Sequence, residues 1–136
     1  MSAPLESLIP HRAPMQWIDA LTDCTDTTAS ATVRFTTGHF AVADGMVTET
    51  ALIECVAQTV AAALGCRPQI NGLTSRANNG MLVAVSNFHI HPPLPLEKPV
   101  LIEVRELKRF GPMLLIASVV SCEGQVIAQG ELSLYA

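Results

Sequence analysis

Two residues of the chain have the types and the spacing needed for acid and base chemistry. His39 lies between Gly38 and Phe40, and Glu54 follows 15 positions later, inside the apolar stretch Ala51–Cys66. A neutral imidazole can take a proton from a carbon next to a carbonyl group, and a carboxylic acid can protonate a departing hydroxyl group. A nonpolar environment favours the protonated form of a carboxyl group. His39 and Glu54 are therefore candidates for acid–base chemistry.

Each of these residues also has a simpler explanation. A histidine in a loop is most often an ordinary surface residue without a catalytic role. A glutamate in an apolar helix can be a buried hydrogen-bonding group, with Gln58 or a backbone N–H as its partner. Cys55, next to Glu54, is expected to be an inert thiol of the core rather than a nucleophile.

The stretch that carries Glu54 is predicted to be one long helix from Thr48 to Leu64. Thr48 is a good N-cap residue, and Gly65 supplies a C-terminal stop. Almost every residue between them is Ala, Leu, Ile, Val or Cys. The helix is therefore nonpolar nearly all the way round and must be enclosed on most sides. Glu54 and Gln58, four residues apart, share one face.

The remaining segments predict strands. Thr27–Phe35 alternates between apolar and polar residues, which is typical of a half-buried strand. A helical turn is expected at Pro4–Ile9, a short first strand at Met15–Leu21, and a loop from Thr36 to Val47. Four further strands are predicted at Met81–Ile90, Val100–Phe110, Met113–Cys122 and Gln125–Tyr135. Short turns at Gly111-Pro112 and Glu123-Gly124 favour antiparallel hairpins.

A single apolar helix and a five- or six-stranded antiparallel meander predict an α+β chain with the hotdog fold, in which the sheet curls around the helix. The whole chain, residues 1–136, is expected to be one domain. Such a sheet has an exposed edge, which pairing with a second copy would cover. A homodimer or a higher homo-oligomer is therefore expected.

Composition narrows the classes of function. Hydrophobic residues make up 49% of the chain and charged residues 15%, which excludes a disordered chain. A net charge of −4 with scattered Lys and Arg argues against nucleic acid as a ligand. The longest apolar stretch is shorter than the ~20 residues that span a bilayer, so no membrane insertion is expected. Four cysteines without C-x-x-C spacing and the lack of a leader pattern indicate reduced thiols in the cytoplasm.

No metal or organic cofactor is expected. His89 and His91 have the spacing of a metal-binding pair, but no third ligand is evident near them. His11 and Arg12 are expected to hold the N-terminal segment by hydrogen bonds.

Three segments, in order, resemble the FabA/FabZ-type 3-hydroxyacyl-[acyl carrier protein] dehydratases of the hotdog superfamily. They are Ile9-Pro10-His11-Arg12-Ala13-Pro14-Met15, Gly38-His39-Phe40 and Leu52-Ile53-Glu54-Cys55-Val56-Ala57-Gln58. The resemblance implies that His39 of one subunit and Glu54 of the other meet across a dimer interface and remove water from a 3-hydroxyacyl thioester. It also implies substrate contacts at four positions: Phe40, Glu49, Thr50 and Gln58. The N–H groups near Glu49 and Thr50 would polarise the thioester oxygen.

The chain departs from that family where Pro-Gly is usual and Thr48-Glu49 stands instead. Glycine lets a backbone approach a substrate closely, so Glu49 puts the width of the pocket in question. These departures make the chain look more like the divergent dehydratase-like proteins of bacterial aryl polyene pigment pathways, some of which work beside a second hotdog subunit. Arg105, Lys108 and Arg109 could contact an acidic acyl carrier protein, or they could be a solvated strand end.

The sequence thus predicts dehydration of a thioester linked to acyl carrier protein or coenzyme A, in fatty acid or polyketide and polyene biosynthesis. Two alternatives remain open. One is a hotdog thioesterase, in which Glu54 activates water or attacks the carbonyl group. The other is a non-catalytic hotdog subunit that acts only with a partner.

Overall fold

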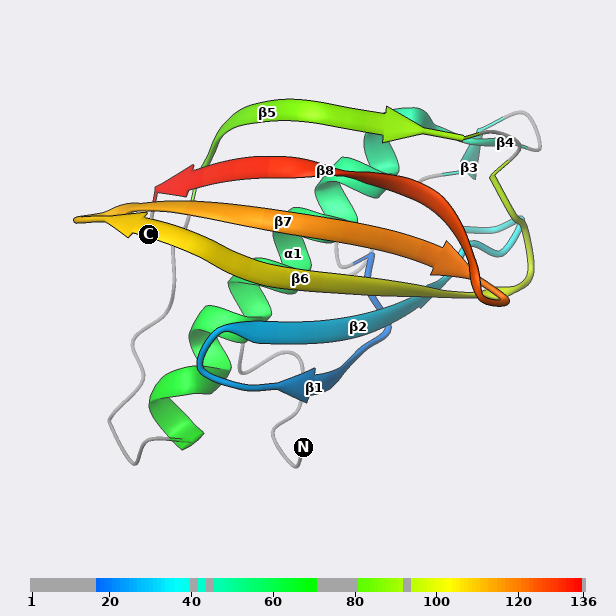
Figure 1. The fold of residues 1–136 in the computed structure, drawn as a ribbon. Coiled ribbons are helices and arrows are strands. Elements are labelled where there is room, and N and C mark those ends of the chain that lie inside the picture. Colours follow the sequence, from blue (N-terminus) through cyan, green and yellow to red (C-terminus); the bar gives the residue numbers. More distant parts are fainter. Residues whose placement is uncertain (1–16, 40–41, 44–45, 71–80, 92–93, 136) are drawn as a thin grey trace.

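A six-stranded antiparallel sheet curls around one long helix, as expected for the hotdog fold (Figure 1). The computed structural model describes residues 17–39, 42–43, 46–70, 81–91 and 94–135. Its elements are β1 (Ala20–Cys24), β2 (Thr28–Arg34), β3 (Val42–Ala43), β4 (Met46–Val47), α1 (Glu49–Ile70), β5 (Met81–Ile90), β6 (Pro99–Phe110), β7 (Met113–Cys122) and β8 (Gln125–Tyr135). The turn predicted at Pro4–Ile9 lies outside the described residues.

The strand order of the large sheet is β1-β2-β6-β7-β8-β5. The expected meander is confirmed for β6, β7 and β8, which are joined by short turns. It is wrong for β5, which pairs with β8 at the far edge while β6 pairs with β2. The chain therefore crosses the sheet between β5 and β6. This crossing leaves β1 and β5 as the two edge strands.

The helix begins at Glu49, as the N-cap residue Thr48 predicts, but it runs past Gly65 to Ile70. The predicted stop was wrong because Gly65 is buried, and its neighbour Cys66 is only 1% exposed. Burial outweighs the cost of about 1 kcal/mol for a glycine inside a helix. Among the described residues, no helix has the length and hydropathy needed to cross a bilayer.

The core lies between α1 and the inner face of the sheet, where β1, β2 and β6 contact the helix. Alternate residues of β2, β6 and β7 point inward and are buried. In Gln125–Tyr135 apolar and polar residues alternate, which predicts that Val126 points inward with Ala128. This prediction is wrong at the start of β8, because the register with β7 shifts between Ser121 and Val120. This bulge turns Ile127 inward, at 7% exposure, and leaves Val126 39% exposed.

The first strand begins five residues later than predicted, at Ala20 rather than Met15. Before it, the N–H groups of Trp17 and Ile18 point to the side chain of Gln58 on α1 rather than to a neighbouring strand. The predicted loop from Thr36 to Val47 also contains a small hairpin of β3 and β4.

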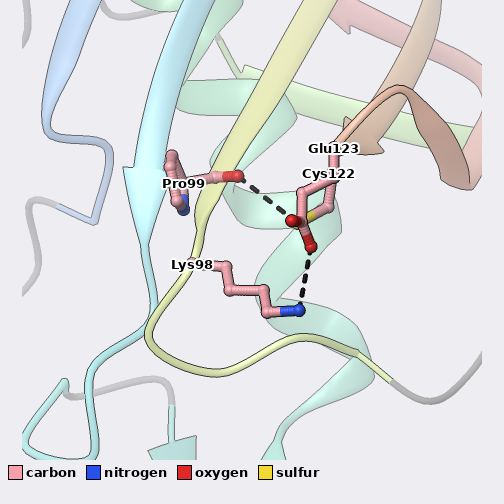
Figure 2. Close-up of polar contacts among 4 residues, drawn as sticks. All are labelled: Lys98, Pro99, Cys122 and Glu123. Atoms are coloured by element: carbon pink, nitrogen blue, oxygen red, sulfur yellow. Dashed lines mark hydrogen bonds and ion pairs between the residues drawn. The ribbon is translucent and has the colours of Figure 1, made fainter.

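The start of β6 is tied to the turn between β7 and β8 (Figure 2). The buried thiol of Cys122 donates to the carbonyl oxygen of Pro99 over 3.4 Å. Lys98 forms an exposed ion pair of 2.8 Å with Glu123, and this hydrogen bond raises the pKa of Lys98. Glu123 and Gly124 both have positive φ angles, of 53° and 80°, so the turn reverses tightly.

The edge strand β5 bulges toward β8 at one glycine. Asn87 and Phe88 stand opposite Gly130, and Asn87 has a φ angle of 52°. A Cβ atom added at Gly130 would lie 2.4 Å from the Cα atom of Phe88. Only glycine therefore lets the bulge approach β8 and place Phe88 against the core.

We expect Gly130→Ala to lower the free energy of unfolding by about 1–3 kcal/mol, because the new methyl group must push the backbone of Phe88 outward. Urea denaturation followed by circular dichroism would measure this loss. Gly38→Ala is the matched control, since a Cβ atom there meets nothing within 4 Å. Equal stabilities of the two variants would contradict the close packing of β5 on β8.

Candidate active site

The start of α1 presents main-chain N–H groups. Glu49 and Thr50 are its first two residues, and the first intrahelical contact is from the N–H of Ala51 to the oxygen of Thr48 over 3.0 Å. The first N–H groups of a helix have no carbonyl group one turn earlier, and the helix dipole makes this end attractive to negative charge. The side chain of Thr50 is exposed. The predicted donor position for a thioester oxygen therefore exists in the main chain.

Glu54 lies on the one face of α1 that the sheet does not fully cover. Between Thr50 and Cys66, the exposed and partly exposed positions of the helix form a single stripe: Thr50, Ile53, Glu54, Ala57 and Leu64. At about 100° per residue these positions span roughly one quarter of the helix. The prediction that the helix is enclosed on most sides is confirmed, and the uncovered side is the one that carries the acid.

The amide of Gln58 connects Glu54 to the segment before β1. Gln58 is only 1% exposed. Its Nε2 donates to Oε2 of Glu54 over 3.0 Å. Its Oε1 accepts from the N–H of Trp17 over 2.9 Å and from the N–H of Ile18 over 3.4 Å. The hydrogen bond expected between Glu54 and Gln58 is therefore present.

His39 is held on the other side of the same segment. Its ring is half-buried and packs edge-on against Phe35 and Trp17, with ring centroids 5.2 and 6.3 Å away. Its Nε2 lies 3.2 Å from the carbonyl oxygen of Trp17. Its own N–H and C=O are bonded to Thr36 and Val42. The backbone and the ring of His39 are thus both fixed.

These contacts place His39 and Glu54 on opposite ends of one hydrogen-bonded series. It runs from His39 to the main chain of Trp17, then to the amide of Gln58, then to Glu54. The sequence did not point to Trp17, because its polar contribution comes from the backbone, which every residue has. Only its place as the single tryptophan of the chain set it apart.

Other predicted site residues have different outcomes. Phe40, His11 and Arg12 lie outside the described residues, and of Glu49 only the main-chain position at the helix start is described. His89 and His91 are exposed. Among the described residues, no group of three metal-ligating side chains occurs.

The three predicted carrier-binding cations are exposed on β6, toward the tip of the β6–β7 hairpin. Lys108 stands over the ring of Phe110, with its Nζ 4.6 Å from the centroid. Arg109 pairs with Glu106 over 3.2 Å. Arg105 lines a hollow of about 340 Å³ on the outer face of the sheet, beside Glu103. In Figure 1 the hairpin extends past the other strands, at the end of the sheet away from the start of α1.

Two surface hollows, each of about 340 Å³, lie away from the acid and the base. The first is the outer hollow beside Arg105, and the second lies at the β7–β8 turn near Leu94 and Lys98. Neither is lined by His39 or Glu54.

The sequence profile of the ApeP-like family, described as ApeP dehydratase, matches residues 3–136. The chain belongs to this family. It is thus related to dehydratases, as the resemblance in the sequence implies. No curated protein matches the sequence.

Solved structures of low sequence identity share the fold. The dehydratase heterocomplex ApeI:P from Xenorhabdus doucetiae matches with a TM-score of 0.88 at 21% identity, covering 99% of this chain and 91% of the other. The homologue of HP0420 from Helicobacter felis matches with a TM-score of 0.72 at 13% identity, covering 100% and 92%. Thioesterase superfamily member 2 from Mus musculus matches with a TM-score of 0.65 at 14% identity, covering 85% and 80%.

All four cysteines of this ApeP-like chain are buried thiols. Burial in the core and the neighbouring charge of Glu54 raise the pKa of Cys55 far above its ordinary value. A thiol with a raised pKa is a poor nucleophile, since the thiolate is the reactive form. The structure therefore supports the expectation that Cys55 is an inert residue of the core.

We expect the native chain to resist Ellman's reagent at pH 8, because its thiols are buried and that of Cys55 stays protonated. Absorbance of the released thiolate would report the reaction. In guanidinium chloride all four thiols should react at once, which is the internal control. Rapid modification of Cys55 in the native chain, located by mass spectrometry, would show that the core around α1 is open.

Proposed function

We propose that this chain catalyses the dehydration of a 3-hydroxyacyl thioester to a trans-2-enoyl thioester, with His39 as base and Glu54 as acid. The observation that carries the proposal is the carboxyl group of Glu54, half-buried on an apolar helix and hydrogen-bonded to Gln58, in a member of a dehydratase family. The acyl group is carried by an acyl carrier protein or coenzyme A. Such a reaction belongs to fatty acid or polyene-type biosynthesis in the cytoplasm.

The two groups supply complementary proton transfers. His39 removes a proton from C2 of the acyl chain, next to the thioester carbonyl, while Glu54 gives its proton to the hydroxyl group on C3. The C3–O bond breaks, water leaves, and the electron pair of the C2–H bond forms the double bond. Transfer of the proton from the imidazolium to the carboxylate restores both residues. No metal or organic cofactor takes part.

The carbonyl oxygen of Trp17 determines which nitrogen of His39 acts as the base. A carbonyl oxygen only accepts hydrogen bonds, so Nε2, which faces the oxygen of Trp17 at 3.2 Å, carries a hydrogen. In the neutral ring, Nδ1 then has the lone pair that takes the proton from C2. The N–H groups of Glu49 and Thr50 polarise the thioester oxygen, and Phe40 contributes to the binding of the substrate.

A second hotdog chain completes the site in this proposal. Ile53, Ala57 and Leu64 form a partly exposed apolar stripe beside Glu54, and β5 is an edge strand with β8 as its sheet neighbour. Exposed apolar stripes and free strand edges are surfaces that association covers. The second chain is another copy of this one or a different hotdog subunit. It would bring its histidine to the side of Glu54 that the sheet leaves open.

We expect His39→Ala and Glu54→Gln each to slow dehydration by about 10²–10⁴-fold, the usual contribution of a positioned acid or base. The absorbance of the conjugated enoyl thioester would measure the rate. His89→Ala and Glu103→Gln are the matched controls, because they remove the same groups from exposed strand positions. Either active-site variant retaining the rate of the unmutated chain would disprove its role.

The same assay separates the alternatives. Release of a free thiol without an enoyl product would identify a thioesterase. If the purified chain is inactive alone and activity appears only with a second hotdog protein, the same variants tested in that mixture decide whether this chain supplies the acid, the base or neither.

The exposed cations of β6 are proposed to bind the acidic surface of the carrier. We expect replacement of Arg105, Lys108 and Arg109 by Gln to raise the KM for a carrier-bound substrate about tenfold, because electrostatic attraction to the carrier is lost. The KM for a small thioester should not change. Arg34→Gln with Lys98→Gln controls for the lost charge, and an equal effect on both substrates would rule out carrier binding.

A further inference from the structure

Gln58 is a fully buried polar side chain whose amide group has one possible orientation. The N–H groups of Trp17 and Ile18 both point at the same atom, at 2.9 and 3.4 Å. Two donors require an acceptor, so this atom is Oε1 and the other is Nε2. The backbone before β1 therefore fixes the direction in which Gln58 donates. That direction is toward Oε2 of Glu54.

The main chain of Trp17 holds the two candidate catalytic residues from its two sides. Its N–H donates to Gln58, and its carbonyl oxygen accepts from Nε2 of His39 at 3.2 Å. The carbonyl group of Trp17 and the N–H of Ile18 belong to one planar peptide group, and that N–H also points to Oε1 of Gln58 at 3.4 Å. A shift of Trp17 that breaks its contact with Gln58 therefore also moves the oxygen that selects the tautomer of His39.

We propose that Gln58 is a positioning residue that aligns both catalytic residues of its own chain, acting on Glu54 directly and on His39 through the main chain of Trp17. The catalytic role of Gln58 rests on the proposed dehydration. The alignment of the two side chains is a property of the folded chain and can be measured without the reaction. Gln58 donates to Oε2 of Glu54, so a protonated Glu54 carries its hydrogen on Oε1. The same alignment holds the neutral ring of His39 as the Nε2–H tautomer.

A merely structural role for Gln58 makes a different prediction. A buried amide that only satisfies the backbone would lower stability when it is removed, without changing the state of the imidazole. Thr59 provides such a case on the same helix. It is fully buried, and its Oγ1 donates to the carbonyl oxygen of Cys55 over 2.8 Å. Thr59→Val thus removes a buried hydrogen bond whose two partners, Thr59 and Cys55, are neither Glu54 nor Trp17.

The test is ¹⁵N nuclear magnetic resonance of the histidine rings in the unmutated chain, Gln58→Met and Thr59→Val. The spectrum of His39→Ala identifies the signals of His39. We expect the Nε2–H tautomer in the unmutated chain and in Thr59→Val, and a mixture of tautomers in Gln58→Met. The Nδ1–H tautomer in the unmutated chain would overturn the proposal, and so would an unchanged imidazole spectrum in Gln58→Met. The tautomer of the unmutated chain can be measured even if the variants do not fold.

Kinetics supply the second readout. Loss of the buried hydrogen bond that orients Glu54 predicts that Gln58→Met lowers kcat about 10- to 100-fold. KM should change little, because Gln58 is buried and its amide bonds to Trp17 and Glu54 of its own chain. Thr59→Val should leave kcat nearly unchanged. An equal loss of kcat in both variants would show that Gln58 acts only through stability. If the unmutated chain does not dehydrate thioesters, the proposed function fails, while the tautomer measurement still tests the alignment.

Discussion

The structure depends on burying α1, because this helix is apolar on almost every side. Of the positions from Thr50 to Cys66 all but one narrow stripe are buried, and β1, β2 and β6 contact the helix. Bulges in β6 and β8 bend these two strands. Polar residues survive in such a helix only where a partner is available. Thr59 bonds back to the carbonyl group of Cys55, Gln58 reaches the backbone before β1, and Glu54 occupies the stripe that remains open. The position of the acid therefore follows from the incomplete cover.

Trp17 and Ile18, just before β1, form hydrogen bonds to the helix residue Gln58 rather than to a neighbouring strand. Had Trp17 and Ile18 continued β1, their N–H groups would bond to the neighbouring strand, and Gln58 would be a buried amide without those donors. Leaving such a group unsatisfied costs about 1–3 kcal/mol. One exchange of hydrogen bonds therefore explains both the late start of β1 at Ala20 and the fixed direction of the amide of Gln58. It also places the carbonyl group of Trp17 against the ring of His39.

Sequence reasoning reached the parts of this arrangement that side-chain patterns encode. Apolar content predicted α1, alternation predicted β2, the turns at Gly111-Pro112 and Glu123-Gly124 predicted the hairpins of β6, β7 and β8, and the resemblance to dehydratases predicted the family. Sequence reasoning failed where backbone hydrogen bonds or tertiary packing determine the structure. The burial of Gly65 carried the helix past its expected stop, and a bulge at Ile127 reversed the alternation in β8. The role of Trp17 left no trace in the sequence, because a peptide group has the same chemistry at every residue.

The open stripe on α1 links assembly to chemistry in the proposed reaction. One chain leaves Glu54 half-buried, so water still reaches the carboxyl group. A second hotdog chain packed on Ile53, Ala57 and Leu64 would exclude that water from the reacting groups. Gln58 fixes the direction of the carboxyl group before association, because its own partners lie within the same chain. In this proposal the chain sets the geometry of its acid, and the partner closes the open side of that acid.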